Sequence, residues 1–193
     1  MHLLTPLVLL ALTGAASAGA ADMQFAQAAR PAPAAPQGGA NQGGANQGAA
    51  QAPKSIGTFG DWQAATHQEA GQLVCYAFTR ASASTPAVPG RGDVILTVTH
   101  RVGVRGAVAI GAGFAYPAST DVTVQVDKAE LAFYTAGRSA FATEGKAAID
   151  AFTRGTTAVA RSPGPRGSRV QDTFSLRGFT ASYEAINKAC PAR

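Results

Sequence analysis

The sequence lacks most of the patterns that identify an enzyme or a metal protein. It has two cysteines and three histidines, and none of the histidines has a cysteine, histidine or carboxylate at metal-ligand spacing. It has no Gly-x-Ser-x-Gly turn of a hydrolase, and the glycine-rich segment 103–113 lacks the Gly-Lys-Ser/Thr of a phosphate-binding loop. We therefore expect no enzyme activity, no metal and no cofactor.

Beyond its N-terminus the chain also lacks an apolar run long enough to span a bilayer, which takes about 20 residues. The N-terminal apolar run, 3–12, is about half that length. It is followed by Ala16-Ser17-Ala18 and Ala18-Gly19-Ala20, small-residue patterns typical of signal-peptide cleavage. We predict a signal peptide over 1–20, cleaved after Ala18 or Ala20, and export to the periplasm, the cell surface or the medium. No cysteine lies near the cleavage site, which argues against a lipid anchor.

The segment that follows lacks the side chains that build a core. Between Arg30 and Lys54 there is no charge and no large apolar residue, and the motif at 37–41 recurs at 42–46. Such a segment cannot bury enough surface to offset the entropy lost on ordering. We predict a disordered linker over 21–55 and one folded domain over 56–193.

Acidic residues are scarce, because 11 Asp and Glu stand against 16 Lys and Arg and give a net charge of +5. From Gly155 to Arg177 the only acid is Asp172. The arginines in and next to this segment are Arg154, Arg161, Arg166, Arg169 and Arg177. A shared face would attract anions, and the candidate partner-binding residues are Arg161, Arg166 and Arg169. An ordinary solvated basic face is the alternative.

Aromatic residues do not alternate with these arginines, as they do in proteins that stack single-stranded nucleic acid. We therefore expect no nucleic-acid partner. The expected partner is an anionic component of the envelope, or another protein. Arg91-Gly92-Asp93 also spells an adhesion tripeptide, but chance explains a tripeptide in a chain of this composition, and Asp93 begins a predicted strand.

From residue 56 onward apolar residues mostly alternate, with Gly or Pro punctuation, which indicates an antiparallel sandwich or barrel. The predicted strands are 58–65, 72–80, 93–102, 107–114, 121–126, 130–134, 139–143, 156–161 and 170–176. Two helices are predicted, a short internal one over 146–154 that stops at Gly155, and a C-terminal one over 179–190. The second helix places Phe179, Tyr183, Ile186 and Cys190 on one stripe that faces the core.

Cys75 lies within a predicted strand, and Cys190 ends the last helix. An even number of cysteines in an exported chain favours a disulfide. Closing a loop of more than 100 residues would stabilise the fold by about 4–5 kcal/mol in the chain-entropy model. The two cysteines lack the Cys-x-x-Cys spacing of a redox pair, so we expect a structural bond. Pairing between two chains remains an alternative.

Several segments occur in an order that resembles the invasion-associated locus B (IalB) family of bacterial envelope proteins. They are Gly60-Asp61-Trp62, the strand around Cys75, residues 113–117, the helix near 149–155 and the run 172–179, Asp-Thr-Phe-Ser-Leu-Arg-Gly-Phe. The resemblance implies an immunoglobulin-like antiparallel β-sandwich located in the periplasm or outer envelope.

We therefore expect a mainly β, exported protein that binds in the envelope without catalysis, through the basic region 154–177 and the loop 113–117. Two other functions stay open. One is a structural or stress-linked periplasmic protein with no dedicated ligand. The other is a hydrolase with an unfamiliar site, although no nucleophile–base pair can be named.

Overall fold

The computed structural model describes residues 52–192. The predicted signal peptide, 1–20, and residues 21–51 of the predicted linker lie outside the described residues. The helices are α1 (Gly145–Arg154) and α2 (Phe179–Ala189), with a 3-10 turn, η1 (Pro165–Gly167). The strands are β1 (Lys54–Phe59), β2 (Trp62–Glu69), β3 (Gln72–Arg80), β4 (Ala83–Thr85), β5 (Ile95–Arg101), β6 (Val104–Gly111), β7 (Asp121–Val126), β8 (Ala129–Ala136), β9 (Ser139–Ala142), β10 (Thr157–Pro163) and β11 (Arg169–Ser175).

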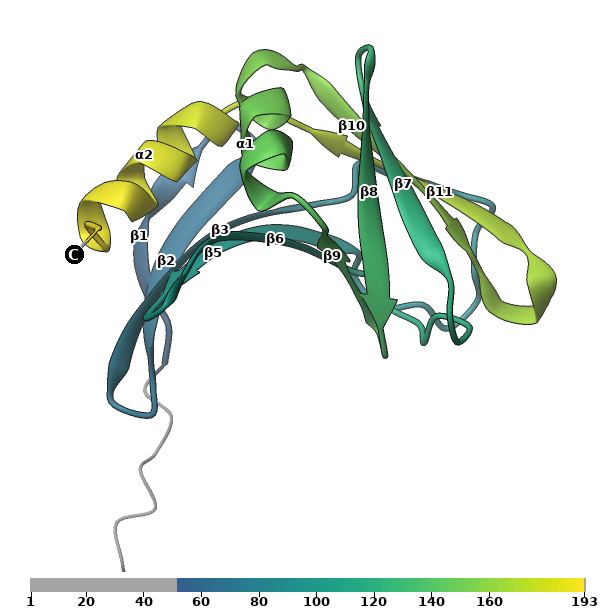
Figure 1. Cartoon of the computed structure of the whole chain (residues 1–193), viewed down its shortest axis with the longest axis horizontal. Coiled ribbons are helices and arrows are strands. Elements are labelled where there is room, and N and C mark those ends of the chain that lie inside the picture. The colour runs from purple at the N-terminus through teal and green to yellow at the C-terminus, as the bar shows by residue number, and fades with distance from the viewer. Residues whose placement is uncertain (1–51, 193) are drawn as a thin grey trace, which may run out of the picture. The chain divides into compact units, whose positions relative to one another are not determined.

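All of these strands join one antiparallel sheet in the order β1-β2-β3-β5-β6-β9-β8-β7-β10-β11-β4. The sheet curves strongly, with β1, β2, β3, β5 and β6 on one side of the domain and β7, β8, β10 and β11 on the other (Figure 1). β4 follows β3 in the chain but pairs with β11, so the chain crosses from one half to the other within a few residues. The prediction of a mainly β, antiparallel, sandwich-like fold with two helices is confirmed.

Both halves of the sheet contribute to one core. Leu96 and Ile110 from the first half and Phe133 and Phe174 from the second are completely buried in the same cluster. The sequence alternates accordingly, as in β7, where alternate valines are buried and the residues between them are half-exposed or exposed. The alternation thus turns one face of each strand toward a shared interior.

The predicted strand 58–65 is wrong at one point, because the chain turns at Gly60 and Asp61 and forms two strands. Gly60 has a φ of 57°, a left-handed conformation that glycine adopts at little cost. β4 was not predicted, since its residues are all exposed and show no alternation. The bounds of β3 and β7 agree with the predicted ranges.

The two helices pack on the sheet through an aromatic cluster. The ring of Phe179, at the start of α2, lies 4.9 Å from Trp62 on β2 and 5.4 Å from Phe152 on α1, both edge to face. Each of the three residues is at most 1% exposed. Trp62, the single tryptophan, is therefore a core anchor between the helices and the sheet.

Cys75 and Cys190 form a disulfide within the chain, across a sequence separation of 115 residues. It ties the end of α2 to β3, and the predicted pairing is confirmed. Among residues 52–192, no helix combines the length and apolar character needed to cross a membrane.

Candidate functional site

Two of the predicted binding residues, Arg161 and Arg169, line one cleft of about 670 Å³. Arg161 lies on β10 opposite Gln171 of β11, and Arg169 lies two residues from Gln171 on the same strand. Side chains two apart on a strand point to the same face, so both guanidinium groups lie on the outer face of the sheet. Pro117, from the loop 113–117, lines the same cleft. The structure thus brings together parts of both predicted binding segments.

The cleft also contains two carboxylates that the sequence analysis did not associate with the arginines. Asp121 begins β7 and Glu130 lies on β8, and both line the cleft with Arg161 and Arg169. None of the ion pairs in the described part of the chain involves any of these four side chains. The cleft therefore presents two cations and two anions that are available to a ligand.

Arg166 does not line the cleft but lies on the β10–β11 connection beside it. Its backbone is left-handed, with a φ of 56°, and its side chain is exposed. The connection is closed by its own hydrogen bonds, from Gly164 N to Ser168 O at 2.7 Å and from Ser168 Oγ to Pro165 O at 2.9 Å. Arg166 is thus held at the tip of an ordered turn.

The other two arginines of the basic region lie elsewhere. Arg177 pairs with Asp61 at 2.6 Å, and Arg154 ends α1. The region 154–177 therefore does not place all its arginines on one face, although Arg161 and Arg169 share a cleft.

The loop 113–117 is held firmly against the domain. Arg138 donates to the carbonyl oxygen of Gly113, and Tyr116 N donates to Gly137 O at 2.9 Å. Phe114 is buried, and the guanidinium of Arg91 lies 4.8 Å from the centre of its ring. Burial raises the pKa of Tyr116 to about 12. Among the loop residues, Pro117 reaches the cleft.

The adhesion tripeptide at 91–93 is not displayed. Arg91 donates to both oxygens of Asp172, at 2.8 and 2.7 Å, and the two side chains are only 5% and 3% exposed. Asp93 pairs instead with Arg80 at 2.9 Å. Arg91 is therefore part of the folded interior, and it neutralises the one acid of the basic region there.

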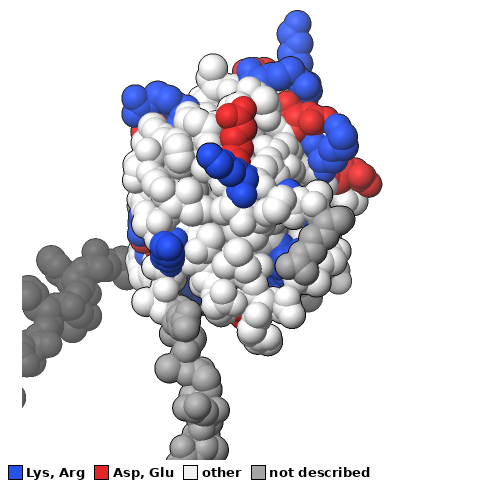
Figure 2. Space-filling model, turned by 90° about the vertical axis from the view of Figure 1, so that its left-hand side faces the viewer, with Lys and Arg blue, Asp and Glu red and all other residues white. Residues whose placement is uncertain are grey.

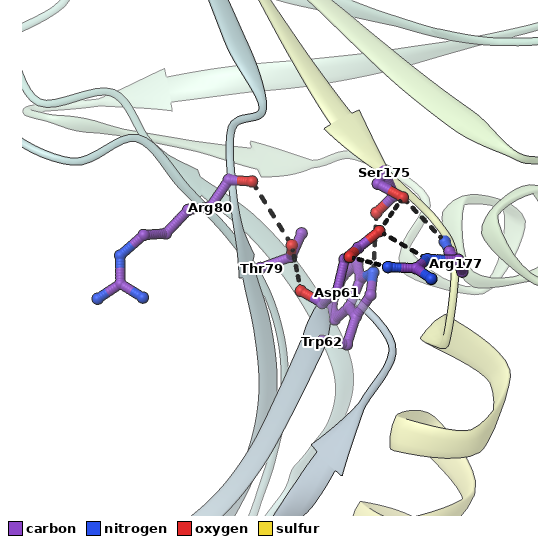
Figure 3. Close-up of polar contacts among 6 residues, drawn as sticks. All are labelled: Asp61, Trp62, Thr79, Arg80, Ser175 and Arg177. Carbon is purple, nitrogen blue, oxygen red and sulfur yellow. Dashed lines mark hydrogen bonds and ion pairs between the residues drawn. The ribbon is translucent and has the colours of Figure 1, made fainter.

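Gly60-Asp61-Trp62 lies beside the end of β11, and hydrogen bonds of Asp61 and Trp62 with Ser175 and Arg177 join the two segments (Figure 3). We call this group of contacts the clasp. The Trp62 indole N–H donates to Ser175 O at 2.9 Å, and Asp61 N donates to Arg177 O at 3.0 Å. The Asp61 carboxylate accepts hydrogen bonds from Ser175 Oγ at 2.7 Å and from the Arg177 guanidinium at 2.6 Å. The bond from Arg177 is the main reason that the pKa of Asp61 falls to about 2.

Glycines allow the two chain segments of this clasp to approach each other. A Cβ on Gly178, which has a φ of 93°, would overlap the carbonyl oxygen of Phe59. A Cβ on Gly60 would lie 2.7 Å from Arg177 O. The positive φ angles of Gly60 and Gly178 and the short distances around them both require glycine. These two residues therefore allow the N-terminal strands to pack against the segment between β11 and α2.

His100 is buried at the other end of α2. Its Nδ1 accepts from Gly106 N at 3.0 Å, which leaves Nε2 to donate to Asn187 Oδ1 at 3.0 Å. Burial, and secondarily the charge of Arg105, lowers its pKa. The ring is therefore a neutral structural group. Among residues 52–192, no three His, Cys, Asp or Glu side chains are grouped as a metal site would need.

Comparison with known proteins identifies a family for the sequence. The family model described as "Invasion associated locus B (IalB) protein" matches residues 62–187. A crystal structure of invasion associated protein B from Bartonella henselae is similar at 18% sequence identity and a TM-score of 0.47, covering 69% of this chain and 95% of that one. A search of curated proteins gives no significant match.

Proposed function

The chain belongs to the invasion associated locus B family, and we propose that it is an exported protein that binds an anionic component of the bacterial envelope without catalysis. Export is supported by the N-terminal apolar run with its small-residue cleavage patterns at Ala18 and Ala20. The disulfide between Cys75 and Cys190 supports an oxidising compartment such as the periplasm.

The proposed binding site is the cleft that contains Arg161 and Arg169. The observation that carries the proposal is that these guanidinium groups share a face and form no ion pair within the described residues. A guanidinium group binds a carboxylate or phosphate through two parallel hydrogen bonds. Arg166, at the tip of the adjoining turn, extends the basic surface beyond the cleft.

The carboxylates of the cleft restrict the ligand. Asp121 and Glu130 repel a uniform polyanion, but they accept hydrogen bonds from hydroxyl groups. A ligand that carries both anionic groups and hydroxyls satisfies all four side chains. Acidic saccharides, such as the sugar–phosphate part of lipopolysaccharide, have this chemistry.

The absence of catalysis is part of the proposal, and one contact supports it. Ser168, a hydroxyl-bearing residue of the cleft, donates its Oγ proton to Pro165 O at 2.9 Å. The hydroxyl therefore stabilises the turn and does not point its proton at a base. Binding needs no such activation.

Calorimetric titration of the oxidised protein lacking residues 1–20 with lipopolysaccharide tests this site. The triple variant R161A/R166A/R169A should bind at least about tenfold more weakly, because charge-assisted hydrogen bonds are lost. The control K128A/R154A/K188A removes equal charge outside the cleft. Equal losses in the two variants would mean that net charge alone attracts the ligand, and no binding by the wild type would contradict the proposal.

A structural envelope role is the second candidate, and the clasp favours it. Asp61, Trp62, Arg177 and Gly178 all belong to segments that the family resemblance identified, and all of them close the fold. If the cleft binds nothing while deletion of the gene weakens the envelope under stress, this second function is the better account.

A further inference from the structure

Large apolar side chains are exposed at the tips of two neighbouring hairpins. Leu73, in the β2–β3 hairpin, is 41% exposed, and Val102 and Val104, in the β5–β6 hairpin, are 65% and 46% exposed. Across residues 52–192 only Ile56 and Tyr134 are comparable. Most of the exposed large apolar side chains of the described domain therefore gather at one end of it.

The register of the sheet explains why this end is uncovered. β3 pairs with β5 from Arg80 and Ile95 to Cys75 and His100, and continuing that register places Leu73 opposite Val102. α2 covers the sheet up to the disulfide but ends at Ala189. Leu73 and Val102 lie beyond that point and line a cleft of about 550 Å³ with the residues that follow α2.

The surroundings of these tips are basic. Arg101 and Arg105 line the same cleft, and Lys54 lines an adjoining hollow that also contains Leu73. Arg105 donates to two neutral acceptors, Cys190 O at 2.6 Å and Asn187 Oδ1 at 2.8 Å, and it forms no ion pair with a carboxylate of residues 52–192. Glu69 is already engaged by Arg101, at 3.4 Å.

Figure 2 views the side of the domain that carries these hairpins. Most of its surface is uncharged. Figure 1 shows the β2–β3 hairpin at the lower left, whereas the β10–β11 connection beside the proposed cleft lies at the far right. The two surfaces are thus at opposite ends of the domain.

We propose that these hairpin tips form a membrane-docking surface for an anionic lipid bilayer. Protruding aliphatic side chains enter the boundary between headgroups and acyl chains, and nearby Lys and Arg side chains contact lipid phosphates. The aliphatic side chains that would enter the bilayer are Leu73, Val102 and Val104. The basic side chains that would contact the phosphates are Lys54, Arg101 and Arg105. This surface is separate from the arginine cleft and does not depend on the proposed function.

A lipid bilayer fits this surface better than a flat protein partner. The apolar residues lie on two narrow tips that flank a cleft, so they can enter a fluid headgroup layer without any change in the sheet. The charge is complementary, since the bases at the tips outnumber the one paired acid.

Vesicle sedimentation tests the proposal. The oxidised chain lacking residues 1–20 is mixed with vesicles of phosphatidylcholine containing about 30% phosphatidylglycerol, and with phosphatidylcholine alone. The wild type should bind the anionic vesicles, and L73N/V102N should lower the partition coefficient by about tenfold. R101Q should lower it by about fivefold on the anionic vesicles alone. Thermal unfolding of each variant checks that the fold is intact.

Two control variants distinguish the hairpin tips from the rest of the protein surface. Y134N removes an exposed apolar side chain on β8, away from the tips, and should bind as the wild type does. R161A/R166A/R169A should also keep vesicle binding, so failure of the arginine cleft leaves this proposal standing.

Three results would overturn the proposal. The first is no binding of the wild type to anionic vesicles. The second is equal loss in L73N/V102N and Y134N. The third is a dimer, seen by analytical ultracentrifugation, that L73N/V102N abolishes, since the tips would then bind a second copy of the chain.

Discussion

Replacing Arg91 with methionine should destabilise the domain more than any exposed substitution in the same loop. The variant keeps most of the aliphatic volume and removes the guanidinium that binds Asp172. Both side chains of this pair are at least 95% buried, so the Asp172 carboxylate would remain in the interior with only Ser84 Oγ, at 2.7 Å, to stabilise it. Arg91 also donates to Ala112 O at 2.6 Å, and that bond is lost too.

The expected loss in the free energy of unfolding follows from the unpaired Asp172 carboxylate that the variant leaves buried. Breaking a buried ion pair by removing one partner costs about 3–5 kcal/mol, because the remaining charge is uncompensated. For a domain of this size that corresponds to a fall in Tm of about 10–20 °C. The double variant R91M/D172L removes both charges and should recover at least about 2 kcal/mol, since apolar replacements of buried pairs are often neutral.

Urea unfolding followed by the fluorescence of Trp62 measures these values, because Trp62 is the only tryptophan and is fully buried. R80M is the matched control. Arg80 pairs with Asp93 across the same loop, but those side chains are 55% and 64% exposed. Exposed pairs contribute about 0–1 kcal/mol. If R91M cost no more than R80M, the reasoning from burial would be refuted.

Other substitutions test the remaining structural conclusions. Gly178→Ala should cost well over the ~1–2 kcal/mol expected for Gly71→Ala, because both have positive φ but only Gly178 has a backbone oxygen in the way; thermal unfolding compares them. Replacing Cys75 and Cys190 with alanine should lower the free energy of unfolding by about 4–5 kcal/mol, since the bond closes a loop of 115 residues; urea unfolding of reduced wild type should agree. Burial lowers the pKa of His100, so the stability that its neutral form contributes is present above pH 6.5 and is lost as pH falls below 6.5, where the unfolded chain takes up a proton first. Unfolding of His100→Gln between about pH 7 and pH 5 should therefore depend less on pH than unfolding of the wild type, and an unchanged slope would contradict the assignment.

The strands that could be predicted from the sequence are those with one face buried in the core and the other exposed. β7 was placed correctly because Val122, Val124 and Val126 alternate with polar residues and meet one core. The break between β1 and β2 could not be predicted, since the turn at Gly60 is held by Arg177, more than 100 residues away. Local patterns show which face of a strand is buried, but they do not show which distant segment the turn contacts.

In the candidate site, too, local features could be predicted but contacts between distant segments could not. Arg161 and Arg169 were candidates because the segment around them is basic, and both are exposed. Their proximity to Asp121 and Glu130 depends on the pairing of β10 with β7 and of β7 with β8, which the sequence does not specify. Similarly, nothing local shows that Arg91 is buried against Asp172. Which charged side chains share a surface depends on the strand pairing, so a ligand could be proposed only once the topology was known.

Salt should separate the two proposed surfaces, because their chemistry differs. Ligand binding at the Arg161–Arg169 cleft depends on exposed charges, which salt screens over about 8–10 Å at ionic strengths of about 0.1–0.15 M. Docking through the apolar tips removes apolar surface from water, which salt does not weaken, so only the part supplied by Lys54, Arg101 and Arg105 is lost. Raising the salt from about 0.1 to 0.5 M should therefore reduce saccharide binding more steeply than vesicle binding. Equal salt dependence would mean that one electrostatic attraction accounts for both, and the apolar tips would then have no separate role.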